Sequence, residues 1–145
     1  MPAEVFVDSG IWFEAATPKR PAHERSAAVL REAYEEHRQL VTTNLVIAEA
    51  HALLLRRVNR HVAWEFLRLV RMAPNTVVAS TPELEERAIQ GWIQRYDDQD
   101  FSLADAVSFA VMAGRGITEA LTLDRHFAVA GFTVRPSLAR SRRDI

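Results

Sequence analysis

Apolar residues along this chain gather in short unbroken runs, and several of these runs end on a polar or acidic residue. The first run, at residues 5–7, lacks the alternation of a strand with one wet face, and Asp8 follows it directly. Such a run is typical of a strand buried on both faces of a parallel sheet. Similar runs predict further strands at residues 40–42, 75–80, 119–123 and 131–136.

Between the strands, apolar residues recur at the spacing of helices. This spacing predicts helices over residues 24–38, 45–58, 60–72, 82–96 and 102–116. The second of these is apolar almost all round and is expected to be buried, with Thr43 or Asn44 available to cap its start. Thr81 and Pro82 similarly mark the start of the fourth helix.

Strands and helices alternate through the chain. This order predicts an α/β fold in three layers, with a mostly parallel central sheet of about five strands and helices on both of its faces. The length of 145 residues and the hydrophobic content of 48% are in the range of one globular domain. We therefore expect residues 1–145 to form a single domain that ends in a basic tail at 136–145.

Cysteine is absent, which excludes a disulfide framework, a thiolate zinc site and a cysteine nucleophile. No run reaches the roughly 18 apolar residues of a membrane span, and no basic residue precedes Lys19 that could open an export signal. We expect a cytoplasmic protein without membrane contact. Lys19 is the single lysine among 18 basic residues, and the remaining arginines suit phosphate partners.

Four carboxylates occupy positions that an ordinary surface would not favour. Asp8 and Asp124 each follow an apolar strand, Glu49 interrupts an apolar helix, and Asp105 lies in the first turn of a helix. An aspartate after a strand is often only a turn residue, and the sequence from Ser102 to Asp105 fits a capping box. Glu49 is the hardest to explain in this way, because an unpaired carboxylate in a buried helix is costly.

These acids are expected to meet. The carboxyl ends of parallel strands share one edge of a sheet, and helices that begin there bring their first turns to the same crevice. Carboxylates packed closely repel one another unless a positive charge joins them, and a hard divalent cation such as Mg²⁺ or Mn²⁺ accepts oxygen ligands. Zinc is disfavoured because no zinc-ligand spacing links the five histidines, which are His23, His37, His51, His61 and His126.

The stretches "VDSGIW", "TTNLVIAEA", "SLADAVSFAVM" and "LTLDRHF" together resemble the PIN-domain ribonucleases, most of all the small toxins of bacterial VapBC toxin–antitoxin pairs. The resemblance extends from the first strand to about Pro136 and keeps the order and rough spacing of the four acids. It implies a PIN-like fold and a single PIN domain. Gly10 departs from the pattern, since many members carry a larger residue there.

The resemblance also implies the site and its chemistry. It implies an endoribonuclease that hydrolyses RNA phosphodiester bonds with Mg²⁺, for which Mn²⁺ can substitute. The metal-binding and catalytic acids would be Asp8, Asp105, Asp124 and Glu49, the last acting through a water. The supporting groups around them would be Ser9, Thr43, Asn44 and Ser102.

Partners follow from the same resemblance, which implies an RNA substrate, a small antitoxin and a homodimer. Because phosphate binding needs positive charge, arginines are candidates for RNA contact, although a solvated face or a frayed tail explains them equally well. They are Arg56, Arg57, Arg60, Arg135, Arg140, Arg142 and Arg143. An aromatic groove beside the acids could hold the antitoxin, with core packing as the alternative explanation of its residues, Trp12, Phe13, Trp64 and Phe66.

Two other enzyme classes fit poorly. A haloacid-dehalogenase phosphotransferase needs a second aspartate where this chain has Gly10, and a receiver domain needs a lysine on a late strand, which Lys19 cannot supply. A catalytically silent PIN fold that binds RNA or protein stays open as an alternative. The sequence leaves transfer, ribosomal and messenger RNA open as substrates, because RNA recognition depends on loop shape and unpaired bases.

Overall fold

The structure is a computed structural model, and it describes residues 3–137. In this part of the chain, five strands form one sheet in the order β3-β2-β1-β4-β5, and all four neighbouring pairs are parallel. The strands are β1 (Glu4–Val7), β2 (Gln39–Thr43), β3 (Asn75–Val78), β4 (Glu119–Leu121) and β5 (Thr133–Arg135). The parallel five-stranded sheet that the sequence predicts is confirmed.

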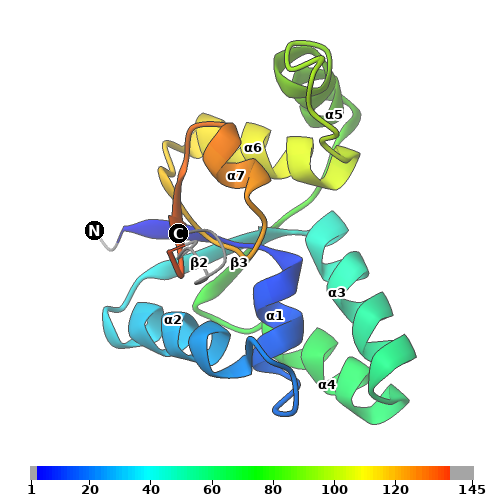
Figure 1. Ribbon diagram of the computed structural model, residues 1–145, viewed down its shortest axis with the longest axis vertical. Coiled ribbons are helices and arrows are strands. Elements are labelled where there is room, and N and C mark those ends of the chain that lie inside the picture. Colours follow the sequence, from blue (N-terminus) through cyan, green and yellow to red (C-terminus); the bar gives the residue numbers. More distant parts are fainter. Residues whose placement is uncertain (1–2, 138–145) are drawn as a thin grey trace, which may run out of the picture.

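Helices cover both faces of this sheet. They are α1 (Ser9–Ala15), α2 (His23–Glu35), α3 (Asn44–Arg57), α4 (Arg60–Val70), α5 (Pro82–Ala88), α6 (Leu103–Arg115) and α7 (His126–Val129), and a π-helical turn at Ile89–Ile93 extends α5. Helices α1, α2 and α4 lie on one side of the sheet and α6 and α7 on the other, which makes three layers (Figure 1). None of the helices in residues 3–137 has the length and apolar character needed to cross a bilayer.

The core is centred on β1, as its unbroken apolar run predicts. Val5, Phe6 and Val7 are fully buried, because β1 is the middle strand and both of its faces are covered. On one face, Phe127 of α7 packs edge-on against Phe109 of α6 with ring centroids 4.9 Å apart. Phe127 also contacts Phe6 of β1. This aromatic cluster therefore packs α6 and α7 against the sheet.

Helix α1 is not predicted by the sequence pattern. It begins directly after Asp8, contains Gly10 and is only seven residues long. Four consecutive residues, Ile11 to Glu14, are buried, so no polar face marks a helical period. The short helix is recognisable only after the chain has folded against α2 and α3, both of which it contacts.

The prediction that α3 is buried all round is wrong. Only Val46, Ile47, Ala50 and Leu54 are buried, and Leu55 is 47% exposed. The helix therefore has an apolar face toward the fold and a solvent face that is itself partly apolar, which the sequence pattern could not separate.

Candidate active site

A cavity of about 550 Å³ opens at the carboxyl edge of the sheet. Figure 1 shows this edge of the sheet, where β1 leads into α1. Its wall combines residues from α1, α3 and α6 with residues just before α1, just before α6 and after β4. They are Asp8, Ser9, Gly10, Glu49, Ser102, Asp105, Leu123, Asp124 and Arg125. All four acids singled out in the sequence thus line one cavity.

Asp8 is the most buried of these acids, with 7% of its surface exposed. The hydroxyl of Thr122 donates a hydrogen bond of 2.9 Å to its Oδ2. Burial raises the pKa of Asp8 to about 7, against the opposing effect of the Ser9 backbone amide and of Thr122. The negative charges of Asp105 and Asp124 push the pKa of Asp8 further upward.

Asp105 caps its own helix and faces the cavity at the same time. Its backbone N–H donates to Ser102 Oγ over 3.0 Å, and its Oδ2 accepts from the Ser102 N–H over 3.4 Å, which completes the predicted capping box. Burial raises the pKa of Asp105, and the charge of Asp124 adds to this, while contacts with His126 and Ser102 lower it. Capping and a role in the cavity, which the sequence presents as alternatives, are both compatible with this geometry.

Asp124 is held in a tight turn after β4. Its backbone N–H donates to Thr122 Oγ1, and its Oδ1 accepts from the backbone N–H of His126, each over 2.9 Å. Thr122 therefore joins Asp124 to Asp8 through one fully buried hydroxyl. Sequence reasoning missed Thr122, although a threonine two positions before an acid at the end of an apolar strand could have indicated it.

Glu49 reaches the cavity from the solvent side of α3. The expectation that it is buried is wrong, since it is an exposed residue on a helix whose apolar face points elsewhere. The hydroxyl of Ser9 donates a hydrogen bond to Glu49 Oε1. Ser9 thus contacts an acid of the cavity.

Two of the predicted supporting residues do not reach the cavity wall. Thr43 caps α3, because its hydroxyl accepts the Val46 backbone N–H over 3.1 Å. Asn44 uses its side-chain oxygen to accept the Ser80 backbone N–H over 2.8 Å and so connects α3 to the segment after β3. Both side chains are committed to backbone partners near the start of α3, which corrects the expectation that they support the acids.

His126 is a further missed residue. Its ring Nδ1 lies 3.4 Å from Asp105 Oδ2 and 3.5 Å from Asp124 Oδ1. No sequence signal distinguishes it from the other histidines, because the turn after β4 that brings it to Asp105 has no fixed spacing to α6. Asp105, Asp124 and His126 together form a group that could hold a metal ion.

The predicted RNA-binding arginines within residues 3–137 do not line the cavity. Arg56, Arg57 and Arg60 are exposed around the turn between α3 and α4. Arg135 forms ion pairs with Glu32 and Glu119, so its expected role in RNA contact is not favoured. Arg140, Arg142 and Arg143 lie outside the described residues. The basic residue of the cavity wall is instead Arg125, which is exposed and follows Asp124 directly.

The donor set of the cavity fits a divalent cation. Within residues 3–137, neither lysine nor arginine forms an ion pair with any of its four acids. Glu14, which is as buried as Asp8, shows the contrast. Its carboxylate binds the guanidinium of Arg20 over 2.8 Å and accepts the Ala22 backbone N–H over 3.1 Å. Several carboxylate oxygens that converge without a lysine or arginine partner are the ligands that Mg²⁺ or Mn²⁺ accepts.

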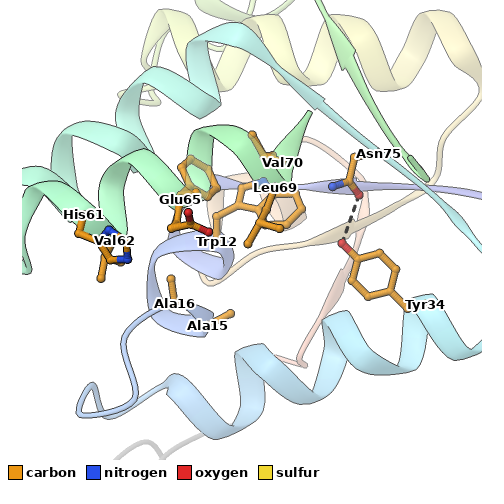
Figure 2. A pocket seen from close by; sticks show the side chains of 11 residues that line it. Trp12, Ala15, Ala16, Tyr34, His61, Val62, Glu65, Leu69, Val70 and Asn75 are labelled. Carbon is orange, nitrogen blue, oxygen red and sulfur yellow. Dashed lines mark hydrogen bonds between the residues drawn. The ribbon is translucent and has the colours of Figure 1, made fainter. Parts of the chain in front are cut away.

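A second cavity, of about 410 Å³, is apolar and lies between α1, α2 and α4 (Figure 2). Trp12 and Phe66 line it, with ring centroids 6.0 Å apart. Phe13 is buried beneath the Arg20 guanidinium instead, and the exposed Trp64 is outside the lining, so two of the four expected groove residues are misplaced. None of the four acids lines this groove, which corrects the expectation that it runs beside them.

The model of the PIN-domain family matches residues 5–133 of this chain. The chain belongs to the PIN-domain family. The match spans β1 to the start of β5 and includes all four acids of the cavity. The PIN-like fold expected from the sequence is confirmed.

Named relatives of this PIN domain are similar over nearly its whole length. It is 33% identical over 133 residues to the 23S rRNA-specific endonuclease VapC20 of two Mycobacterium tuberculosis strains. The aligned residues cover 91% of this chain and 98% of VapC20. The crystal structure of M. tuberculosis VapC20, described as a sarcin–ricin loop cleaving toxin, superposes with a TM-score of 0.79 at 30% identity. That superposition covers 89% of this chain and 96% of VapC20.

A more distant structure shares the fold. FitAcB from Neisseria gonorrhoeae superposes with a TM-score of 0.59 at 16% identity, over 90% of this chain and 95% of that one. At this identity the likeness concerns the arrangement of strands and helices.

The predicted resemblance to VapC-type toxins is confirmed by the VapC20 comparisons.

Proposed function

We propose that this PIN domain is a divalent-metal-dependent endoribonuclease, the toxin of a toxin–antitoxin pair and, by its family likeness, a homodimer. The observation that carries the proposal is the cavity in which Asp8, Glu49, Asp105 and Asp124 meet without a lysine or arginine partner among the described residues. The likeness to VapC20 supports RNA as the substrate.

The residues of the cavity would have different roles in catalysis. Asp8 and Asp105 would hold the ion directly, Asp124 would complete the site, and Glu49 would orient or deprotonate the attacking water. When bound, a divalent ion supplies Lewis-acid activation of water and neutralises the charge that develops on the phosphate. Thr122 fixes the orientation of Asp8, and Ser9 fixes that of Glu49, through the hydrogen bonds described above.

The substrate is proposed to be 23S ribosomal RNA at its sarcin–ricin loop, as the names of the VapC20 relatives suggest. Arg125 would contact a phosphate next to the scissile bond, because it is the arginine on the wall of the acidic cavity. Arg56 and Arg57 lie about two turns along α3 from Glu49, and Arg60 begins α4, so these arginines could contact a more distant part of the RNA.

Purified protein is expected to cleave ribosomal RNA in the presence of Mg²⁺ or Mn²⁺ and to stop when a chelator is added. In-line attack by an activated water leaves 5′-phosphate ends, so sequencing of the ends after induction in whole cells would map both the site and the chemistry. Excess metal added after the chelator should restore cleavage. Cleavage that resists the chelator would contradict the metal site, and a folded protein that binds RNA without cutting it would favour the silent scaffold.

The antitoxin is proposed to occupy the apolar groove between α1, α2 and α4 (Figure 2). Trp12 and Phe66, which are buried, line it, and so does Leu69, which is 51% exposed. An apolar segment of the antitoxin would cover these side chains, since aromatic residues in pockets are frequent anchors of interfaces. Asp8 immediately precedes α1 and Trp12 lies one turn inside it, so a chain in the groove could extend a basic residue toward the acids.

Leu69→Arg is expected to abolish rescue by the antitoxin while the toxin stays active. A buried charge at the interface should weaken binding by at least about tenfold. Growth on co-expression with the neighbouring small reading frame, together with affinity of the purified pair, would measure this. Met72→Arg is the matched control, because Met72 is equally exposed near the end of α4 but does not line the groove. Equal affinity of the two variants would exclude the groove as the antitoxin site.

A further inference from the structure

His126 is held in a fixed position beside two acids of the cavity. Its ring packs edge-on against Phe101, with centroids 5.2 Å apart and an interplanar angle of 79°. Its backbone N–H binds Asp124 Oδ1, and its side chain is only 21% exposed. The ring is therefore positioned from two sides before any ligand arrives.

The ring nitrogen and the carboxylates form a compact donor set. Ligand atoms of Asp105, Asp124 and His126 all lie within 4.8 Å of one another, and Nδ1 is 3.4 Å and 3.5 Å from the nearest carboxylate oxygens. The 3.4 Å contact with Asp105 Oδ2 is a long hydrogen bond, and the 3.5 Å separation from Asp124 Oδ1 exceeds the usual hydrogen-bond range. They approach the spacing of about 3 Å between neighbouring ligands of one six-coordinate ion with bonds near 2.1 Å.

From this geometry we infer that His126 Nδ1 is a direct ligand of the metal ion, so that the site has a mixed nitrogen and oxygen donor set. The inference rests on the proposed metal-dependent function and adds a ligand to it. Imidazole binds first-row transition ions well, whereas Mg²⁺ prefers oxygen ligands and retained water. The site should therefore select an ion such as Mn²⁺ over Mg²⁺.

An alternative is that His126 only donates a hydrogen bond to Asp105 or Asp124. Loss of such an outer partner also lowers metal affinity, by roughly 10- to 100-fold. Affinity alone thus does not separate the two roles. A magnetic coupling between the ion and a directly bonded nitrogen does, because it requires coordination.

The test uses the full-length protein loaded with Mn²⁺ alone, and pulsed electron paramagnetic resonance to detect coupling to a directly bonded ¹⁴N. Wild-type protein should show the coupling, and His126→Asn should lack it. The variant should also bind Mn²⁺ at least about tenfold more weakly in calorimetry and lose most of the preference over Mg²⁺. His37→Asn is the matched control, because His37 is exposed at the opposite edge of the sheet, before β2, with a φ of 57° that asparagine tolerates.

Several results would overturn the inference. They are a wild-type spectrum without nitrogen coupling, and a coupling that persists in His126→Asn. Should that variant not fold, wild-type protein with ¹⁵N-labelled histidine replaces it, and a spectrum unchanged by the label is then contradictory. If the wild-type protein cleaves RNA in a metal-dependent way but shows no nitrogen coupling, only the role of His126 as a ligand is contradicted. A wild-type protein that binds no Mn²⁺ would contradict the proposed function as well.

Discussion

Asp105→Asn is expected to reduce RNA cleavage by about 10²- to 10³-fold while lowering the free energy of unfolding by less than about 1 kcal/mol. The carboxylate is proposed as a direct metal ligand, and several kcal/mol of charge stabilisation in the transition state would be lost with it. Asparagine keeps an oxygen that can accept the Ser102 backbone N–H, so most of the capping box survives. Initial rates on ribosomal RNA and urea denaturation would measure the two effects separately.

Thr81→Ala provides the matched control for this separation. Thr81 caps α5 by accepting the Leu84 backbone N–H over 3.1 Å, and it does not line the acidic cavity. Its loss should cost about 1 kcal/mol of stability and leave the cleavage rate unchanged. If Asp105→Asn behaved like Thr81→Ala, with stability lost and activity kept, Asp105 would be a helix cap without a catalytic role.

The convergence of the four acids could be predicted because topology alone produces it. Asp8 and Asp124 follow strands that are neighbours in a parallel sheet, so their side chains must emerge at one edge. Asp105 is fixed by the helix start that its own capping box marks. These positions depend on local pattern and on the parallel arrangement of the strands, both of which the sequence predicts; the adjacency of β1 and β4 is known only from the structure.

Other features depend on packing that a sequence does not show. Glu49 was selected for the wrong reason, because hydropathy could not tell which apolar residues of α3 face the fold. Thr122 and His126 act across chain turns whose geometry is set by neighbouring elements. The groove does not include the acids, because α1, unrecognised in the sequence, directs Trp12 into the pocket between α1, α2 and α4 (Figure 2).

Asp8 and Glu14 allow the electrostatics of the metal-free protein to be predicted. Both carboxyl groups are buried, but Glu14 has the Arg20 guanidinium and Asp8 has no basic partner among the described residues. Because burial raises the pKa of Asp8 from 3.8 to about 7, the native state retains a proton between these values that the unfolded state has lost. The free energy of unfolding must then fall as pH rises through this window.

Asp8→Asn is therefore expected to stabilise the metal-free protein at pH 8 by on the order of 2–4 kcal/mol, since one pKa unit corresponds to about 1.4 kcal/mol. The advantage should shrink as pH falls from about 7 toward 4, because Asp8 becomes protonated in the wild type. Mn²⁺ at 1,000 times its dissociation constant should offset this difference at pH 8, since a ligand at that concentration adds about 4.1 kcal/mol to the native state that binds it. Thermal denaturation between pH 4 and 8, with and without metal, would measure both effects.

Glu14→Gln is the control: it breaks the pair with Arg20 and should lower stability, yet it should respond to metal like the wild type. An equal response of wild type and Asp8→Asn to Mn²⁺ would place the ion elsewhere than at the acidic cavity.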